Sequence, residues 1–144
     1  MAELPITYRG AVYPWHCDHM DHMNVAHYVA KFDEATWNFF VLFGLTPAYF
    51  RDEKRGMAAL QQTLVYKREL LAGDTVFVRT RMVEIKDKIV RFEHLMCNGE
   101  TREMAATTEL TATHMDIVAR RAYPFPPETL ARARALLEAH REIE

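Results

Sequence analysis

Between residues 24 and 43, apolar side chains recur at three- and four-residue steps, which predicts an α-helix. Asn24 suits its N-cap, and Gly44 followed by Pro47 supplies its end. In the second half of this helix, apolar residues nearly encircle the axis and leave one polar stripe. The stripe consists of Lys31, Asp33, Glu34 and Asn38. Since a helix that is apolar on most sides is usually buried, we expect a central helix enclosed by other elements.

Strand-type patterns flank this helix. Residues 6–13 are rich in β-branched and aromatic types and predict a first strand that ends at Pro14. After a polar connection at 51–56, four strands follow at 57–68, 75–85, 89–97 and about 101–118. The turn signals between them are Gly73-Asp74, Asp87-Lys88 and Asn98-Gly99, of which the last predicts a two-residue hairpin. The PFPP run at 124–127 ends the sheet, and residues 128–142 predict a terminal helix.

This order of elements predicts an α+β fold in which a sheet wraps a long buried helix. The edges of such a sheet need cover, which a second copy can provide. A length of 144 residues fits one domain, 1–144, so we expect an active site on one core or between copies of it.

Composition narrows the function classes. Charged residues make up 26% of the chain and the net charge is -2, without the basic block that nucleic-acid binding needs. No apolar run reaches the roughly 18 residues needed to span a bilayer, so no membrane partner is expected. Cys17 and Cys97 form no disulfide framework, and the amino terminus lacks the apolar run of a signal peptide. We expect a cytoplasmic protein.

Residues 15–24, WHCDHMDHMN, hold the densest set of reactive side chains. His16, His19 and His22 with Asp18 and Asp21 offer enough ligands for zinc or iron. Three-residue steps converge only on a helix, however, and the segment between Pro14 and Asn24 is predicted to be a loop. No remote Cys or His pair completes a familiar set, and we expect neither a metal nor a cofactor.

Two catalytic readings of the same loop remain. Cys17 has histidines nearby that could activate a thiol, but adjacent side chains often point apart. An Asp that leads into a helix lies beside unpaired N–H groups, which can hold an oxyanion while the carboxylate attacks a carbonyl or deprotonates water. On chemistry alone, Asp18 and Asp21 are equal candidates.

The run DHMDHMNVAHY at 18–28, with FDEA at 32–35, resembles the 4-hydroxybenzoyl-CoA thioesterase branch of the hotdog-fold acyl-CoA thioesterases. That branch carries D-x-x-x-H-x-N-x-x-x-Y followed by F-x-E-A. Residues 65–78, VYKRELLAGDTVFV, resemble its second and third strands. The resemblance implies a hotdog fold, in which a five-stranded antiparallel sheet wraps a long central helix, with a C-terminal helix added here.

The resemblance also implies roles for individual residues. It makes Asp18 the nucleophile or general base, and it places the backbone N–H of Val25 where the family polarises the thioester carbonyl. His22, Asn24 and Tyr28 match loop and helix-start positions of the site. Each has a structural alternative: His22 could brace the loop, Asn24 could only cap the helix, and Tyr28 could be core.

Two positions depart from the family pattern or admit another explanation. Many members have Gly where Asp21 stands, and we expect Asp21 to face water. Glu34 matches the family's helix Glu, but it lies on the polar stripe with Lys31 and Asn38, where a structural ion pair explains it as well as catalysis does.

The implied partner is an acyl-CoA substrate, bound at the interface of a homodimer or a dimer of dimers. Candidate residues for the CoA phosphates are Lys67, Arg68, Arg91, Arg120 and Arg121. Two sequence segments, HMNVAHYVAKFDEATW and GLTPAYF, resemble thioesterases of carnitine and betaine breakdown that act on betainyl-CoA. A quaternary ammonium would suit an aromatic cage, for which Trp15, Trp37, Phe40 and Tyr49 are available. The competing class is a non-catalytic hotdog module that binds acyl groups or only dimerises.

Overall fold

A computed structural model describes residues 3–143 of the chain. In chain order, its elements are β1 (Ile6–Ala11), the 3-10 turn η1 (Pro14–His16), α1 (Val25–Val41), α2 (Pro47–Glu53), β2 (Arg55–Tyr66), β3 (Thr75–Ile85), β4 (Ile89–Asn98), β5 (Met104–Asp116), β6 (Arg121–Ala122) and α3 (Pro127–Arg141). The long strands form one antiparallel sheet in the order β1-β3-β4-β5-β2, with β6 added to β5.

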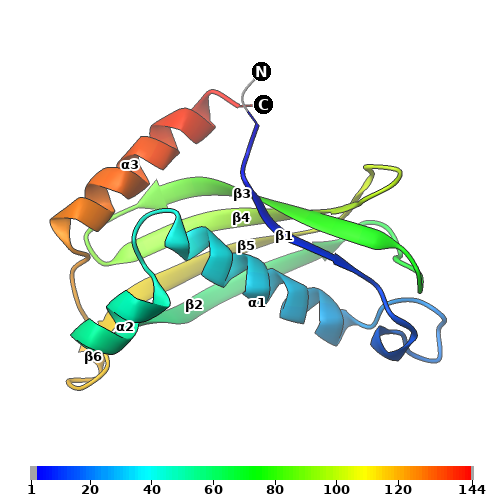
Figure 1. Ribbon diagram of the computed structural model, residues 1–144, viewed down its shortest axis with the longest axis horizontal. Coiled ribbons are helices and arrows are strands. Elements are labelled where there is room, and N and C mark those ends of the chain that lie inside the picture. The colour runs from blue at the N-terminus through cyan, green and yellow to red at the C-terminus, as the bar shows by residue number, and fades with distance from the viewer. Residues whose placement is uncertain (1–2, 144) are drawn as a thin grey trace.

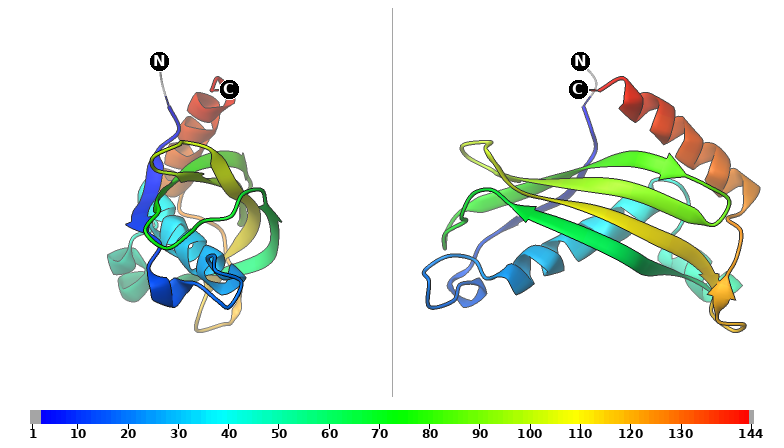
Figure 2. Two further views of the ribbon diagram at one scale, coloured as in Figure 1. Left: turned by 90° about the vertical axis from the view of Figure 1, so that its right-hand side faces the viewer. Right: turned by 180° about the vertical axis from the view of Figure 1, so that it is seen from behind.

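The sheet curls around α1 so that the helix lies in its concave face (Figures 1 and 2). The expected α+β hotdog architecture is therefore confirmed. The strands β1 and β2 are its two edges. Within residues 3–143, no helix is long and apolar enough to cross a membrane.

Helix α1 begins where its sequence signals predict. The side chain of Asn24 accepts a hydrogen bond from the N–H of Ala26, which satisfies one of the unpaired first-turn donors. The buried face of α1 packs against the sheet in two apolar clusters, one around Phe32 and one around Phe39 and Phe40. Gly44 at φ 93° then turns the chain out of the helix region.

The polar stripe expected on α1 is partly wrong. Lys31 is only 4% exposed, and its Nζ donates to the Tyr8 hydroxyl and the Ala11 carbonyl, both at 3.2 Å. Within residues 3–143, Glu34 makes no ion pair, so the structural ion pair considered for it is not found. The reason is β1, which passes over this side of α1 and offers oxygen acceptors to the lysine.

Asp33, Glu34 and Asn38 are exposed as expected, and apolar side chains are exposed along α1 as well. Along α1, Val25 is 55% and Trp37 is 45% exposed, and Val29 and Val41 are also exposed. These four residues are called the α1 stripe below. Beside them, the edge strand β2 exposes Leu60 and Val65. We expected other elements to enclose α1, but on this side of the molecule the helix is left uncovered.

Several element boundaries differ from the expectation. Residues 47–53 form α2 instead of a plain connection, because Thr46 caps a helix with Pro47 in its first turn. As a result, β2 begins at Arg55. Asn98-Gly99 does not make a two-residue hairpin: the Asn98 side chain accepts from the N–H groups of Glu100 and Thr101, and β5 resumes at Met104. The short strand β6 was not expected.

Candidate active site

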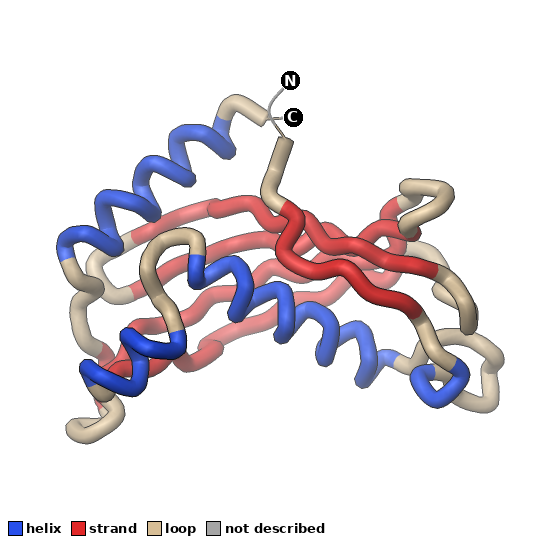
Figure 3. Tube along the Cα trace, in the orientation of Figure 1, coloured by secondary structure: helices blue, strands red, loops and turns tan. Residues whose placement is uncertain are grey.

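The loop between β1 and α1 projects beyond the sheet at the N-terminal end of α1 (Figure 3). It is pinned at its base, because Met23 N–H donates to Leu70 O at 2.8 Å and Asn24 N–H to His16 O at 2.9 Å. Asp21 sits at the tip with φ 65°, which only a few non-glycine residues tolerate. The structure thus confirms a loop at residues 17–24 and gives it a fixed shape.

Asp18 is held by hydrogen bonds to both carboxylate oxygens. Its Oδ1 accepts from the Met20 N–H at 2.9 Å, and its Oδ2 accepts from the Asn24 side-chain amide at 2.8 Å. The Asn24 bond, followed by the Met20 bond, lowers the pKa of Asp18 below its ordinary value. The side chain is therefore a carboxylate at neutral pH, fixed in position and with lone pairs still available for a substrate or water.

Asn24 connects this carboxylate to the start of α1. Its Nδ2 donates to Asp18, while its Oδ1 accepts from Ala26 N–H and its backbone oxygen accepts from His27 N–H. Of the first N–H groups of α1, the one on Val25 has no acceptor among residues 3–143. The structure thus brings Asp18, Asn24 and Val25 together at a helix start, where N–H groups and the helix dipole favour negative charge.

His22 and Tyr28 lie at the edge of this group. The Nδ1 of His22 is 3.3 Å from Met23 O, and its Nε2 is 3.8 Å from Glu69 Oε1. Tyr28 is buried, donates its hydroxyl to Arg68 O at 3.3 Å, and has a pKa raised by burial. Both side chains therefore connect the loop and the helix to the segment after β2.

His16, His27 and Cys17 brace the loop, whereas His19 is exposed. The rings of His16 and His27 lie 4.7 Å apart, and His16 Nδ1 accepts from Tyr13 N–H at 3.0 Å. Burial, followed by the charges of Lys31 and His27, lowers the pKa of His16. Cys17 is half-buried, with its thiol 3.8 Å from Tyr13 O. Within residues 3–143, no group of three His, Cys, Asp or Glu side chains is placed to hold a metal ion.

Of the four aromatic residues considered for a cage, Trp37 and Phe40 contact each other, but Trp15 lies at the other end of α1. Trp15 is 71% exposed in the loop and stacks on Tyr13 at 4.6 Å between ring centroids. Trp37 lies twelve residues after the start of α1, or about 18 Å along its axis. Tyr49 is on α2, where its hydroxyl is bound to the buried His114 at 2.8 Å. A single cage that includes both Trp15 and Trp37 of one chain is therefore excluded.

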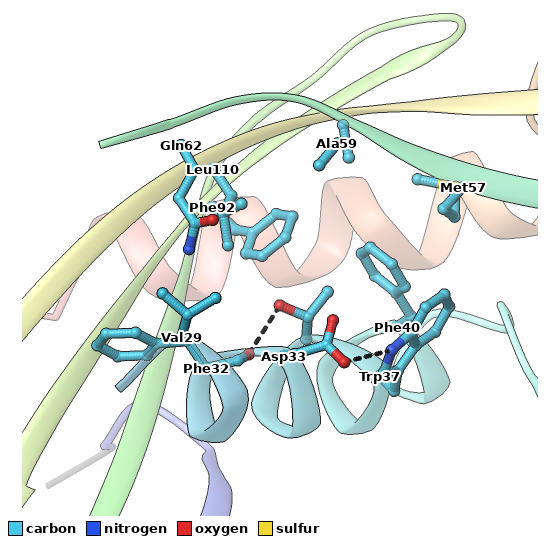
Figure 4. Close-up of a pocket in the computed structure, with 12 residues that line it drawn as sticks. Val29, Phe32, Asp33, Trp37, Phe40, Met57, Ala59, Gln62, Phe92 and Leu110 are labelled. Carbon is cyan, nitrogen blue, oxygen red and sulfur yellow. Dashed lines mark hydrogen bonds between the residues drawn. The ribbon is translucent and has the colours of Figure 1, made fainter. Parts of the chain in front are cut away.

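Sequence reasoning missed a pocket of about 270 Å³ between α1 and β2. Figure 4 shows Val29, Asp33 and Trp37 of α1 facing Ala59 and Gln62 of β2 across it. The Nε1 of Trp37 donates to Asp33 Oδ2 at 3.3 Å. Asp33 was expected on the polar stripe of α1, and its side chain is exposed at the pocket. The one sequence signal for the pocket was its position four residues before Trp37.

The candidate phosphate-binding residues are spread over the molecule. Lys67 and Arg68 belong to the segment that anchors the loop through Leu70 O, and Arg68 pairs with Glu103. Arg91 is engaged by Glu84 and Glu109 on the sheet. Arg120 and Arg121 lie at β6, at the opposite end of the molecule from the loop (Figure 1). Proximity to Asp18 thus favours Lys67 and Arg68.

Comparison with known proteins identifies the family of the chain. A sequence model of the thioesterase-like superfamily matches residues 12–133. Betainyl-CoA thioesterase of Pseudomonas aeruginosa is 28% identical over 143 residues, which cover 99% of this chain and 90% of that protein. A protein of Agrobacterium fabrum named L-carnitine dehydrogenase/betainyl-CoA thioesterase is 30% identical over 125 residues, 87% of this chain and 25% of that protein.

A hypothetical protein of Staphylococcus aureus, solved in complex with CoA, has the same fold. It superposes with a TM-score of 0.90 at 19% identity, over 100% of this chain and 91% of that one. Since the superfamily match spans well over half of the residues, the chain belongs to the thioesterase-like superfamily and is a hotdog-fold thioesterase.

Proposed function

We propose that this thioesterase hydrolyses a small acyl-CoA to the free acid and CoA, with Asp18 as its catalytic carboxylate. The observation that carries the proposal is the pairing of a fixed, low-pKa carboxylate with the open N–H of Val25 at a helix start. Names of relatives add support, because the Pseudomonas protein is a betainyl-CoA thioesterase and the staphylococcal structure holds CoA.

In the proposed reaction, the thioester carbonyl oxygen accepts a hydrogen bond from Val25 N–H. Asp18 either takes a proton from water, which attacks the carbonyl carbon, or attacks that carbon itself and forms a mixed anhydride. The C–S bond then breaks and CoA leaves as a thiolate that takes up a proton. In the second route, water cleaves the anhydride. Asn24 orients the carboxylate in both routes. His22 stabilises the loop through its contacts with Glu69 and the Met23 carbonyl.

The relatives direct the choice of acyl group. Two curated proteins that match this chain carry betainyl-CoA thioesterase in their names, one together with L-carnitine dehydrogenase. We therefore propose betainyl-CoA, from carnitine or betaine breakdown, as the substrate. A cytoplasmic setting fits a CoA substrate and the two free cysteines, Cys17 and Cys97.

A homodimer, alone or within a dimer of dimers, is the proposed assembly, and the whole chain 1–144 is proposed to act as one domain in it. The support is the unpaired edge of β2 next to the exposed apolar α1 stripe. A second β2 could pair along that edge, and the two stripes would then cover each other.

The test measures free thiol release from betainyl-, acetyl-, short-chain and aroyl-CoA by the wild type and by Asp18→Asn. The variant keeps an acceptor for Asn24, so it should fold and assemble normally while turnover falls on the order of 10²- to 10⁴-fold. Near-normal turnover would assign catalysis to another residue. Absence of thiol release by the wild type from every substrate would remove the proposed activity.

A single turnover in oxygen-18 water can identify the anhydride route. Label in the Asp18 carboxylate requires that route, with water attacking the Asp18 carbonyl of the anhydride. Label in the released acid alone results from activated water, or from an anhydride that water opens only at the acyl carbonyl.

A further inference from the structure

The pocket between α1 and β2 contains one charge in apolar surroundings. Of its twelve described lining residues, Asp33 is the charged one, and aromatic rings of Phe32, Trp37, Phe40 and Phe92 form much of the wall. The hydroxyl of Thr36 is already committed, because it donates to Phe32 O and contacts His94. Gln62 is the remaining polar lining residue, so the pocket offers an exposed negative charge beside aromatic faces and few other polar groups.

Asp33 and Trp37 are held relative to each other. Their hydrogen bond of 3.3 Å ties the carboxylate to the edge of the indole ring. Trp37 also makes edge-to-face contacts with Phe40 and Phe50, with centroids 5.7 and 6.0 Å away. A carboxylate and an indole fixed in this way can both contact one cation. The carboxylate then supplies Coulomb attraction and the indole supplies cation–π attraction.

We propose that this pocket binds the quaternary ammonium end of the substrate's acyl group, with Asp33 as its counter-ion and Trp37 as its aromatic wall. Asp33 is then the residue that determines acyl specificity. The proposal rests on the proposed thioesterase function of Asp18 and names the substrate class of that site. An ordinary short acyl chain would contact the apolar wall of the pocket but leave the Asp33 carboxylate without a partner.

The distance from Asp18 adds a condition. Asp33 follows Val25 by eight residues, which is about 12 Å along α1. In a betainyl thioester a single methylene separates the carbonyl carbon from the nitrogen, so the charge lies only about 2.5 Å from the carbon under attack. A thioester held at Val25 therefore cannot place its ammonium at Asp33 of the same chain. The pocket serves the Asp18 of a second copy, whose α1 lies alongside in the proposed dimer.

The experiment compares betainyl-CoA with 3,3-dimethylbutanoyl-CoA, in which carbon replaces the positive nitrogen at nearly the same shape. Asp33→Asn preserves the acceptor for Trp37 and removes the charge. The ratio of kcat/KM for the cationic over the neutral substrate should fall on the order of 10- to 100-fold in this variant. Asp52→Asn, the same chemical change at an exposed position of α2, is the matched control and should leave the ratio unchanged.

Mixed dimers test whether the pocket of one chain serves the Asp18 of the other chain. Differently tagged Asp18→Asn and Asp33→Asn chains are co-expressed, and the dimer carrying both tags is isolated. If Asp33 acts on the partner's site, one site in this dimer has both residues, so about half of wild-type activity returns with wild-type selectivity. If both residues act in the same chain, the surviving site shows the reduced ratio of Asp33→Asn.

Each other outcome has a distinct meaning. If the wild type releases thiol but treats the two substrates alike, or if Asp33→Asn leaves their ratio intact, the cation pocket is wrong while the thioesterase function stands. If the mixed dimer shows the reduced ratio, the assignment of the pocket to the partner's site is wrong. If the wild type hydrolyses no acyl-CoA, the proposed function and this inference both fall.

Discussion

Asn24 uses both ends of one side-chain amide, as donor to Asp18 and as N-cap of α1. Substitutions can separate these two tasks. Asn24→Ser keeps an N-cap oxygen but is too short to reach Asp18, whereas Asn24→Ala removes both interactions. Loss of the cap should cost about 1 kcal/mol of unfolding free energy in the alanine variant and little in the serine variant. Urea unfolding measures this difference.

Both variants should share one kinetic defect. The Asn24 bond is the largest cause of the lowered pKa of Asp18, so its removal raises that pKa. The acidic limb of the kcat/KM profile, where Asp18 gains a proton, should therefore move to higher pH in both variants. An unchanged acidic limb in Asn24→Ser, with turnover preserved, would show that Asn24 acts only as a cap.

Between elements, His94 connects α1 to the sheet through a chain of hydrogen bonds. Thr36 donates its only hydroxyl proton to Phe32 O, so it must accept from His94 Nε2–H at 2.8 Å. On the other side, Nδ1 lies 2.7 Å from the Thr80 hydroxyl, which in turn lies 2.8 Å from the hydroxyl of Thr7 in β1. Burial of the ring lowers the pKa of His94 to about 3.

This arrangement predicts how stability depends on pH. The folded pKa is about 3 and the ordinary value is 6.5, so between these values the unfolded chain binds a proton that the folded chain does not. His94 therefore contributes its full stability above about pH 6.5, and the contribution falls by up to about 1.4 kcal/mol per pH unit below it. His114 and His140, whose pKa values burial also lowers, add to the slope.

The measurement is the unfolding free energy at pH 7.5, 6.5 and 5.5 for the wild type and for His94→Gln. The variant is expected to be less stable at pH 7.5 and to lose stability less steeply as the pH falls. Equal slopes would mean that His94 is accessible to protons in the folded state.

The elements also show what sequence could and could not predict. The start of α1 was predictable because Asn24 and the apolar spacing are local signals. Helix α2 was missed because Gly44 and Pro47 were interpreted as one stop, although Thr46-Pro47 also starts a helix. The burial of Lys31 and the pocket position of Asp33 depend on β1 and β2, which approach α1 from distant parts of the sequence. A local sequence pattern cannot indicate contacts with strands that are so distant along the chain.

The same limit applies to the site. The family resemblance singled out Asp18 over Asp21, and the structure places Asp18 in contact with Asn24, with Asp21 at the exposed loop tip. The aromatic cage was predicted from residue types alone, without a distance constraint. Trp15 and Trp37 therefore looked equivalent, although about 18 Å of helix separates the start of α1 from Trp37.

For the whole molecule, the edge strand β2 and the α1 stripe form one surface that a second copy can cover. Leu60 is 59% exposed near the middle of β2. In an antiparallel pairing of two β2 strands, Leu60→Lys would bring two positive charges close together and remove apolar contact, which disfavours the dimer. The variant should run as a monomer in light-scattering chromatography at concentrations where the wild type is dimeric.

Loss of the dimer should also lower activity, since the acyl pocket proposed for each site belongs to the other chain. Betainyl-CoA hydrolysis by Leu60→Lys should fall with the dimer fraction and recover at high protein concentration. Ala139→Lys introduces the same charge on the exposed side of α3 and should change neither property. A monomeric Leu60→Lys with full activity and selectivity would show that each chain carries a complete site, and it would exclude the shared pocket independently of the mixed dimers.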